Sequence, residues 1–182
     1  MSTRPPSALV VYESMFDNTT QTAEAVARGL RRAGFAAHAV PVTSLASTGP
    51  VDVDLLVVGA PTHGFTLSRR ESRAEAVRQG AGPDRAAIGL RDWIAQSLPQ
   101  RYGTDRLVVF DTRVGRVRHL PLSASRTAAR LLHRRGFRLL RKPVGFAVDR
   151  VRGPLRDGEL ARAENWGRMV GSACLEELSD AA

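Results

Sequence analysis

Short apolar segments alternate with amphipathic segments along most of this chain, and that alternation limits the fold more than any other feature. The apolar runs cover residues 8–13, 35–42, 53–60, 105–112 and 137–148. The third run, VDLLVVGA, is apolar almost throughout, as expected of a strand whose sheet is covered on both faces by helices. Helical patterns fall at 18–32, 89–98, 123–136 and 158–178. The order predicts β-α-β-β-α-β-α-β-α.

Strands and helices of these lengths predict an α/β three-layer sandwich with a five-stranded parallel sheet of order 2-1-3-4-5. Gly34 and Gly136 stand where two helices are expected to end. Pro143 is expected to break the fifth strand. With 182 residues, of which 43% are hydrophobic, the chain is long enough for one well-buried core. We predict a disordered N-terminal tail over 1–7 and a single domain over 8–182.

Ligands of such sheets bind outside the carboxyl ends of the strands, near the point where the strand order reverses. The loops at that edge follow the first, third and fourth strands. They read SMFDNT (14–19), PTHGFTLSRR (61–70) and TRVGRVRHLP (112–121). A binding site is therefore expected where these three loops meet.

The first loop places hydroxyl and amide side chains, from Ser14, Asn18 and Thr19, at the start of a predicted helix. A helix N-terminus with free amides and nearby hydroxyls binds phosphate without needing a lysine. The loop is neither a Walker motif nor a GxGxxG fingerprint. An ordinary helix capped by Asp17 or Asn18 is the alternative interpretation, and the loop alone leaves both open.

Several stretches, taken in order, resemble the flavodoxin-domain proteins of actinobacteria, which belong to the flavodoxin superfamily. They are VVYESMFDNTTQTAEAVARGL, VVGAPTHGFTLSRRESR, GLRDW, VVFDTR and GPLRDGELARAENWG. The resemblance spans nearly the whole chain and implies a flavodoxin-like fold over 8–182. It also implies flavin mononucleotide (FMN) as cofactor.

By matching position, the resemblance implies that the first loop holds the phosphate through the side chains of Ser14, Asn18 and Thr19. The backbone amides of Met15, Phe16, Asp17, Asn18 and Thr19 would also contact it. The resemblance implies that one side of the isoalloxazine ring is flanked by Pro61, Thr62, His63 and Gly64. The other side would be approached by Asp111, Thr112 and Arg113.

The chain departs from the family pattern at Asp17, where the family usually has glycine. Glycine accepts positive φ and lets a phosphate come close. Aspartate tolerates positive φ better than most residues, but two like charges about 4 Å apart repel by roughly 4 kcal/mol at an effective dielectric near 20. A carboxylate turned to solvent would escape most of that repulsion. The orientation of Asp17 therefore decides whether the loop can hold a phosphate.

The net charge of +9 is concentrated in one segment, because residues 113–142 contain ten of the 27 basic residues and none of the 18 acidic ones. Such a surface favours an acidic redox partner, a phosphorylated cosubstrate such as NADPH, or an anionic membrane surface. Single-stranded nucleic acid is disfavoured, since Phe137 is the one aromatic residue in the segment. A solvated arginine-rich face without a partner is the alternative.

Other candidate features are less specific. His63 lies in a predicted ligand loop, while His38, His119 and His133 lack metal-ligand spacing, so no metal is predicted. Asp111 and Arg113 are expected to form an ion pair that shapes the site or clamps a substrate. The insert 68–87 is either a lid or a solvated amphipathic helix, and Cys174 is expected to be a buried structural thiol.

Together these features predict an FMN-binding protein that acts in electron transfer, through a redox partner protein or a small-molecule donor or acceptor, or as an FMN-dependent oxidoreductase. The alternative is a module of the same fold that has lost flavin and engages an acidic partner through its arginine-rich face. The sequence leaves open whether the protein is an enzyme. No apolar run approaches the roughly 20 residues that span a bilayer, and the start of the chain does not resemble a secretory signal, so a cytoplasmic location is expected.

Overall fold

A central parallel sheet organises the computed structural model, which describes residues 4–45, 51–97, 99–115 and 122–180. Its strands are β1 (Ser7–Tyr12), β2 (Ala36–Pro41), β3 (Leu55–Pro61), β4 (Arg106–Val114), β5 (Arg138–Leu139) and β6 (Val144–Val148). The hydrogen-bonded order is β2-β1-β3-β4-β5, and β6 also pairs with β4. The predicted fold class and strand order are confirmed.

The predicted fifth strand is present as two pieces, β5 and β6, which both pair with β4 in parallel. The break over residues 140–143 contains Arg141, Lys142 and Pro143. Charged side chains and proline on an edge strand oppose pairing with the edge of another sheet. The predicted break at Pro143 is therefore confirmed, and it gives this edge protection against self-association.

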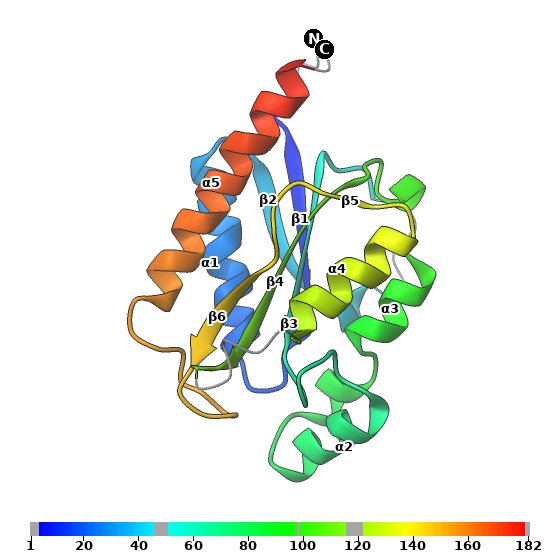
Figure 1. Ribbon diagram of the computed structural model, residues 1–182, viewed down its shortest axis with the longest axis vertical. Coiled ribbons are helices and arrows are strands. Elements are labelled where there is room, and N and C mark those ends of the chain that lie inside the picture. The colour runs from blue at the N-terminus through cyan, green and yellow to red at the C-terminus, as the bar shows by residue number, and fades with distance from the viewer. Residues whose placement is uncertain (1–3, 46–50, 98, 116–121, 181–182) are drawn as a thin grey trace.

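Helices cover both faces of the sheet, as Figure 1 shows. On one face, α1 (Asn18–Arg32) and α5 (Glu159–Asp180) pack over a core that includes Val10, Val57 and Phe110. On the other, α3 (Leu90–Gln96) and α4 (Ala124–Arg134) cover a core that includes Val11, Val58 and Val109. Alternate residues of β1, β3 and β4 thus enter opposite cores, which explains their continuous apolar sequences.

The helices α1 and α5 approach each other at two glycines. A Cβ atom on Gly29 would overlap the carbonyl oxygen of Glu164, and one on Gly167 would overlap the carbonyl oxygen of Val26. Backbone atoms block both positions, so neither contact can relax by a side-chain rotation. This close packing holds α1, and with it the first loop, against the sheet.

The region between β3 and α3 differs from the predicted element order, which has no separate helix there. It contains α2 (Arg70–Arg78) and a short 3-10 helix, η2 (Pro83–Ala86). Arg73 is 5% exposed and donates hydrogen bonds to the carboxylate of Asp92 at 2.9 Å and the carbonyl of Ala86 at 3.1 Å. The insert is therefore anchored to the start of α3 by a buried arginine, which a polar sequence pattern does not indicate.

Further short 3-10 helices are η1 (Val42–Ser44) and η3 (Pro99–Arg101). Within the described residues, no helix combines the length and the apolar character needed to cross a bilayer. Cys174 is fully buried in α5, and burial raises the pKa of its thiol to about 11. A thiol with that pKa stays protonated at neutral pH, which agrees with the structural role expected of it.

Candidate functional site

The first two predicted loops meet the end of β4, which contains the first three residues of the predicted third loop, at one cavity of about 60 Å³. Of the thirteen residues expected to bind the cofactor, all but Asp17, Gly64 and Asp111 line it. The lining comprises Ser14, Met15, Phe16, Asn18, Thr19, Pro61, Thr62, His63, Thr112, Arg113, Val114, Val148 and Val151. The last three belong to the end of β4, to β6 and to the loop after β6.

The first loop turns into α1 through Asp17, which stands at the N-cap with φ 64° and ψ −8°. This is the left-handed conformation that glycine adopts without strain and that aspartate tolerates. The Asp17 side chain makes no capping hydrogen bond. The interpretation of Asp17 as an ordinary side-chain cap is therefore wrong, and the loop keeps the backbone shape expected of a glycine at this position.

The Asp17 carboxylate turns away from the cavity toward the insert after β3. Its Oδ1 accepts a hydrogen bond from Nη1 of Arg85, in η2, at 2.6 Å. The carboxylate is a little over half exposed, at 54%. Asp17 and Arg85 both line a second cavity of about 230 Å³ on the other side of the loop. The negative charge that threatens phosphate binding is thus neutralised outside the first cavity.

The tip of the first loop also packs against the insert. Met15 and Ala76, with Ala81, form a small apolar cluster that Phe16 joins. From the opposite side, the guanidinium of Arg152 lies over the Phe16 ring, 5.6 Å from its centroid. The insert 68–87 therefore supports the loop, and it contains the amphipathic helix that one of the two interpretations predicted, with Arg73 and Ala76 on the buried side.

The second loop forms a tight hairpin at the rim of the cavity. His63 and Thr66 exchange backbone hydrogen bonds at 2.9 and 3.0 Å. Gly64 and Phe65 between them have φ angles of 51° and 67°, the pattern of a type I′ turn. Phe65 is strained there by roughly 1–2 kcal/mol relative to the right-handed conformation, and it is 44% exposed. Phe65 was not among the residues expected to bind the cofactor, although it directly follows Gly64.

His63 lines the cavity in a half-buried position. Burial lowers the pKa of its imidazole, and the nearby positive charge of Arg73 lowers it further. The ring is therefore neutral at pH 7, with one nitrogen able to donate and the other able to accept a hydrogen bond.

The end of β4 contributes Thr112 and Arg113 to the cavity while Asp111 lies behind them. Thr112 Oγ1 lies 2.8 Å from Thr19 Oγ1 in a buried hydrogen bond that ties β4 to the start of α1. The fully buried carboxylate of Asp111 accepts bonds from the backbone N–H and hydroxyl of Ser125. Arg113 Nε lies 3.2 Å from Asp111 Oδ1, so the expected ion pair is present.

The loop after β6 closes the cavity against Asn18. Gly153 adopts a φ of 94°, and a Cβ atom there would overlap the Asn18 amide. Val151, which is 65% exposed, forms the outer rim. Only a glycine with positive φ allows this loop to lie so close to the first loop. The sequence had no local signal for the approach, because about 135 residues separate the two loops.

Directly beneath the first loop, Glu13 follows β1 and is 1% exposed. Its Oε2 accepts a hydrogen bond from the N–H of Leu90, at the start of α3, at 2.7 Å. Burial raises the pKa of this carboxyl group above its ordinary value, against smaller lowering effects of the Leu90 amide, the Ser68 hydroxyl and Arg73. Glu13 thus joins the strand that precedes the first loop to the helix that follows the insert.

Replacing Glu13 with glutamine should change the pH dependence of folding. Because the folded pKa is raised, the stability that Glu13 contributes is complete below the unfolded value near 4.3 and is lost as pH rises through the folded value. The glutamine side chain stays neutral and can still accept the Leu90 hydrogen bond. Chemical denaturation across pH 4–8 should therefore show that the free energy of unfolding of Glu13→Gln rises relative to that of the unaltered protein as pH rises. The relative increase should reach about 1.4 kcal/mol for each unit by which folding raises the pKa of Glu13. Parallel profiles would show that Glu13 is not proton-linked to folding.

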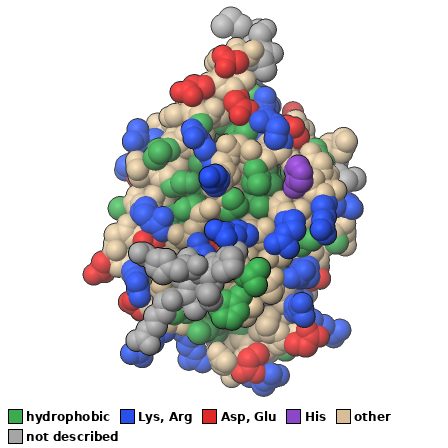
Figure 2. Space-filling view, viewed as in Figure 1, with side chains coloured by type: hydrophobic (Ala, Val, Ile, Leu, Met, Phe, Trp, Pro, Cys, Tyr) green, Lys and Arg blue, Asp and Glu red, His purple; other side chains and the backbone are tan. Residues whose placement is uncertain are grey.

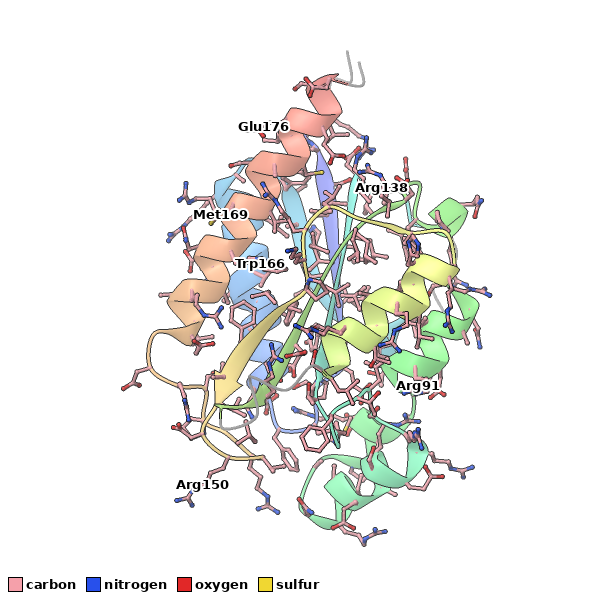
Figure 3. All side chains as sticks on the ribbon, in the orientation of Figure 1. Arg91, Arg138, Arg150, Trp166, Met169 and Glu176 are labelled. Atoms are coloured by element: carbon pink, nitrogen blue, oxygen red, sulfur yellow. The ribbon has the colours of Figure 1, made fainter. Side chains whose placement is uncertain are left out.

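Basic side chains lie over the α4 face of the molecule and near the end of the sheet where the cavity lies. Figure 2 shows blue side chains spread over the face that carries α4. Figure 3 places Arg91 at the start of α3 and Arg150 in the loop after β6, on opposite sides of that end. Among the described residues, the exposed side chains of Arg130, Arg134 and Arg150 form no ion pair. Arg116, Arg118 and His119 of the predicted basic segment and third loop lie outside the described residues.

No protein-family model matches this sequence, and no curated protein sequence matches it. Solved structures do resemble the fold. An archaeal flavodoxin shares 14% identity at a TM-score of 0.57, covering 93% of this chain and 99% of that one. The Streptococcus pneumoniae TIGR4 flavodoxin shares 20% identity at a TM-score of 0.55, covering 88% and 94%. The flavodiiron protein of Giardia intestinalis shares 16% identity at 0.61, with 97% of this chain matching 38% of that larger chain.

Likeness at these identities shows the fold, and this protein has a flavodoxin-like fold. The strand order, the two helical layers and the position of the cavity at the end of β1 and β3 all agree with that conclusion. The actinobacterial kinship and the roles of the individual cavity residues stay predictions.

Proposed function

We propose that this protein binds FMN and acts in electron transfer, as a carrier or as an FMN-dependent oxidoreductase. The observation that supports this most is that residues of the first two loops and of the end of β4 converge on a single cavity in a flavodoxin-like fold. The Asp17 carboxylate, whose charge would oppose phosphate binding, turns away from that cavity toward Arg85. FMN would supply the redox chemistry, and the protein would hold and orient it.

The size of the cavity suggests which part of the cofactor it would enclose. A volume of about 60 Å³ suits a group of a few atoms such as a phosphate, whereas sites that enclose drug-sized ligands measure about 300–1,000 Å³. The phosphate would therefore lie inside, with donors from Ser14, Asn18 and Thr19. The isoalloxazine ring would lie at the rim, next to His63, Phe65 and Val151. The exposed, strained Phe65 offers a flat apolar surface at that position.

Reconstitution tests this proposal. Purified protein incubated with excess FMN and passed through a gel-filtration column should retain the flavin absorbance bands with about one flavin per chain. Phe65→Ala should weaken binding of both FMN and riboflavin about 3- to 10-fold, because an aromatic contact is worth about 0.5–1.5 kcal/mol. Met169→Ala, which removes an apolar side chain of comparable exposure from α5, should leave both affinities unchanged (Figure 3). Flavin that separates completely from the unaltered protein would contradict the proposal.

The charge around the site supports an acidic electron-transfer partner or a phosphorylated cosubstrate such as NADPH. Exposed arginines that form no ion pair within the described residues raise the rate of encounter with an anionic molecule, and the effect weakens as salt screens the charges. The rate of electron exchange with an acidic partner should therefore fall as ionic strength rises.

A flavin-free binding module remains the second candidate, favoured by the small volume of the cavity and by Arg130, Arg134 and Arg150, which form no ion pair within the described part of the chain. Salt-sensitive binding of an acidic polypeptide such as polyglutamate by a protein that retains no FMN would favour this candidate over the first.

A further inference from the structure

Exposed apolar side chains gather in the loops around the cavity. The described part of the chain has five exposed large hydrophobic residues, and three of them lie in loops at the carboxyl end of the sheet. These are Phe65, Leu122 and Val151, which are 44%, 56% and 65% exposed. The other two, Leu160 and Met169, belong to α5. A single exposed hydrophobic residue is normal, but a group of them at one site indicates an interaction surface.

Two hydrogen bonds join the start of α4 to the hairpin that carries Phe65. They run from the Ala124 N–H to Thr62 Oγ1 at 3.1 Å and from the Thr66 hydroxyl to Thr127 Oγ1 at 3.3 Å. Leu122 comes just before the N-cap of α4, so it lies beside this hairpin. Val151, in the loop after β6, lines the cavity together with Thr62. The three exposed apolar residues are therefore carried by neighbouring loops.

Arginines accompany each of these apolar side chains. The segments 61–70, 122–126 and 149–153 contain five arginines, all exposed: Arg69, Arg70, Arg126, Arg150 and Arg152. The one acidic residue in these segments, Asp149, is paired with Arg156. Glu71 and Asp157 follow the segments in the chain, and the balance of charge stays positive. This end of the sheet therefore combines exposed apolar side chains with an excess of cations.

That combination fits a lipid surface better than a folded protein partner. The headgroup layer of a bilayer accepts separate apolar tips of any arrangement, whereas a protein must offer a complementary surface to all of them. Arginine side chains reach lipid phosphates while their stems cover apolar surface. Figure 2 shows hydrophobic side chains toward the lower end of the molecule with basic side chains near them, and Figure 3 places Arg150 at that end.

We propose that the loop surface formed by Phe65, Leu122, Val151 and their neighbouring arginines binds an anionic lipid membrane reversibly. The apolar tips would enter the headgroup region, and the arginines would contact lipid phosphates. Because three side chains bury little apolar area, attachment needs both the apolar and the electrostatic contribution. The mouth of the cavity would then face the lipid. The inference goes beyond the proposed function and does not depend on FMN, since exposed residues alone carry it.

Vesicle flotation tests this inference. The unaltered protein, with and without added FMN, is mixed with vesicles of phosphatidylcholine alone or of equal parts phosphatidylcholine and phosphatidylglycerol. It should bind the anionic vesicles about tenfold or more tightly than the neutral ones, and this binding should weaken as salt rises. The presence of FMN should not be required.

Variants with matched controls locate the contact. Leu122→Ser should lower the affinity for anionic vesicles about 5- to 10-fold, because a half-exposed leucine gains part of the full transfer free energy. Arg69→Gln and Arg150→Gln should each lower it about 5-fold. The controls are Met169→Ser on α5 and Arg134→Gln at the far end of α4, both exposed. Each control should change the affinity less than about twofold, since distant charges are screened.

The outcomes separate this inference from the proposed function. Leu122 is not among the residues proposed to hold FMN, so Leu122→Ser should keep the FMN affinity of the unaltered protein. Vesicle binding by a protein that retains no FMN would support this inference and contradict only the proposed function. Failure of the unaltered protein to bind anionic vesicles would overturn the inference, and polyglutamate binding that Leu122→Ser weakens would then identify an acidic polypeptide as the partner. Equal losses for Arg134→Gln and Arg150→Gln would also overturn it, because they would show a general attraction to a basic protein.

Discussion

Replacing Arg85 with glutamine is expected to weaken FMN binding about tenfold, even though Arg85 does not line the cavity expected to hold the phosphate. Arg85 Nη1 holds the Asp17 carboxylate at 2.6 Å, outside that cavity. Without its partner, the carboxylate gains conformations that turn toward the bound phosphate. Full repulsion at about 4 Å would approach 4 kcal/mol at an effective dielectric near 20. Because the Asp17 side chain is 54% exposed, water screens most of this repulsion. The expected loss of binding free energy is about 1.4 kcal/mol, which corresponds to a tenfold lower affinity for FMN.

The effect of Arg85 should depend entirely on Asp17, which a double-mutant cycle measures. Asp17→Gly should change FMN affinity less than threefold, and Asp17→Gly with Arg85→Gln should match Asp17→Gly alone. Arg78→Gln is the matched control, since Arg78 is an exposed arginine of the same insert paired with Glu75. If Arg85→Gln weakens binding equally with and without Asp17, Arg85 acts on the ligand directly and the pairing is not the cause.

Replacing Gly29 with alanine should destabilise the protein by about 2–4 kcal/mol, opposite in sign to the usual effect of this change in a helix. Alanine favours a helix over glycine by about 1 kcal/mol. Here the added Cβ atom would overlap the Glu164 carbonyl oxygen and crowd the Arg168 backbone nitrogen. Since α5 must shift as a whole, the overlap outweighs the gain in helix propensity.

Thermal unfolding checks this prediction, with an expected fall in melting temperature of about 4–16 °C for a domain of this size. Ser172→Ala, an exposed change on α5, should stay within about 0.5 kcal/mol of the unaltered protein. Stabilisation by Gly29→Ala would show that α1 and α5 pack less closely than described. Gly167→Ala, which faces Val26 across the same contact, should behave like Gly29→Ala.

Most of the fold could be predicted because its elements carry local signals. The apolar run at 53–60 corresponds to β3, and the helical spacing at 18–32 corresponds to α1, Asn18–Arg32. Gly34, with φ 100°, ends the first helix as expected. The parallel order follows from the alternation of strands and helices. The helix α2 lies in the insert for which an amphipathic helix was one of two interpretations. The burial of Arg73 was not predicted, because a buried arginine has the same local pattern as a solvated one.

The candidate site was predicted from the loops that follow three strands, and the structure brings most of those residues to one cavity. What decides its chemistry was not predictable from the sequence. The partner of Asp17 is Arg85, which lies 68 residues away in an insert with no strong pattern. The close contact between the loop after β6 and the Asn18 amide depends on Gly153, a glycine that sequence reasoning alone treats as a turn residue.

The most direct test of the account is a fluorescence titration of FMN with the unaltered protein and Asp17→Gly side by side. If the Asp17 carboxylate is held away from the phosphate by Arg85, both proteins should quench flavin fluorescence with affinities within about threefold of each other. No binding until glycine replaces Asp17 would mean that the carboxylate enters the cavity and that the unaltered protein does not use flavin. No binding by either protein would contradict FMN as the ligand.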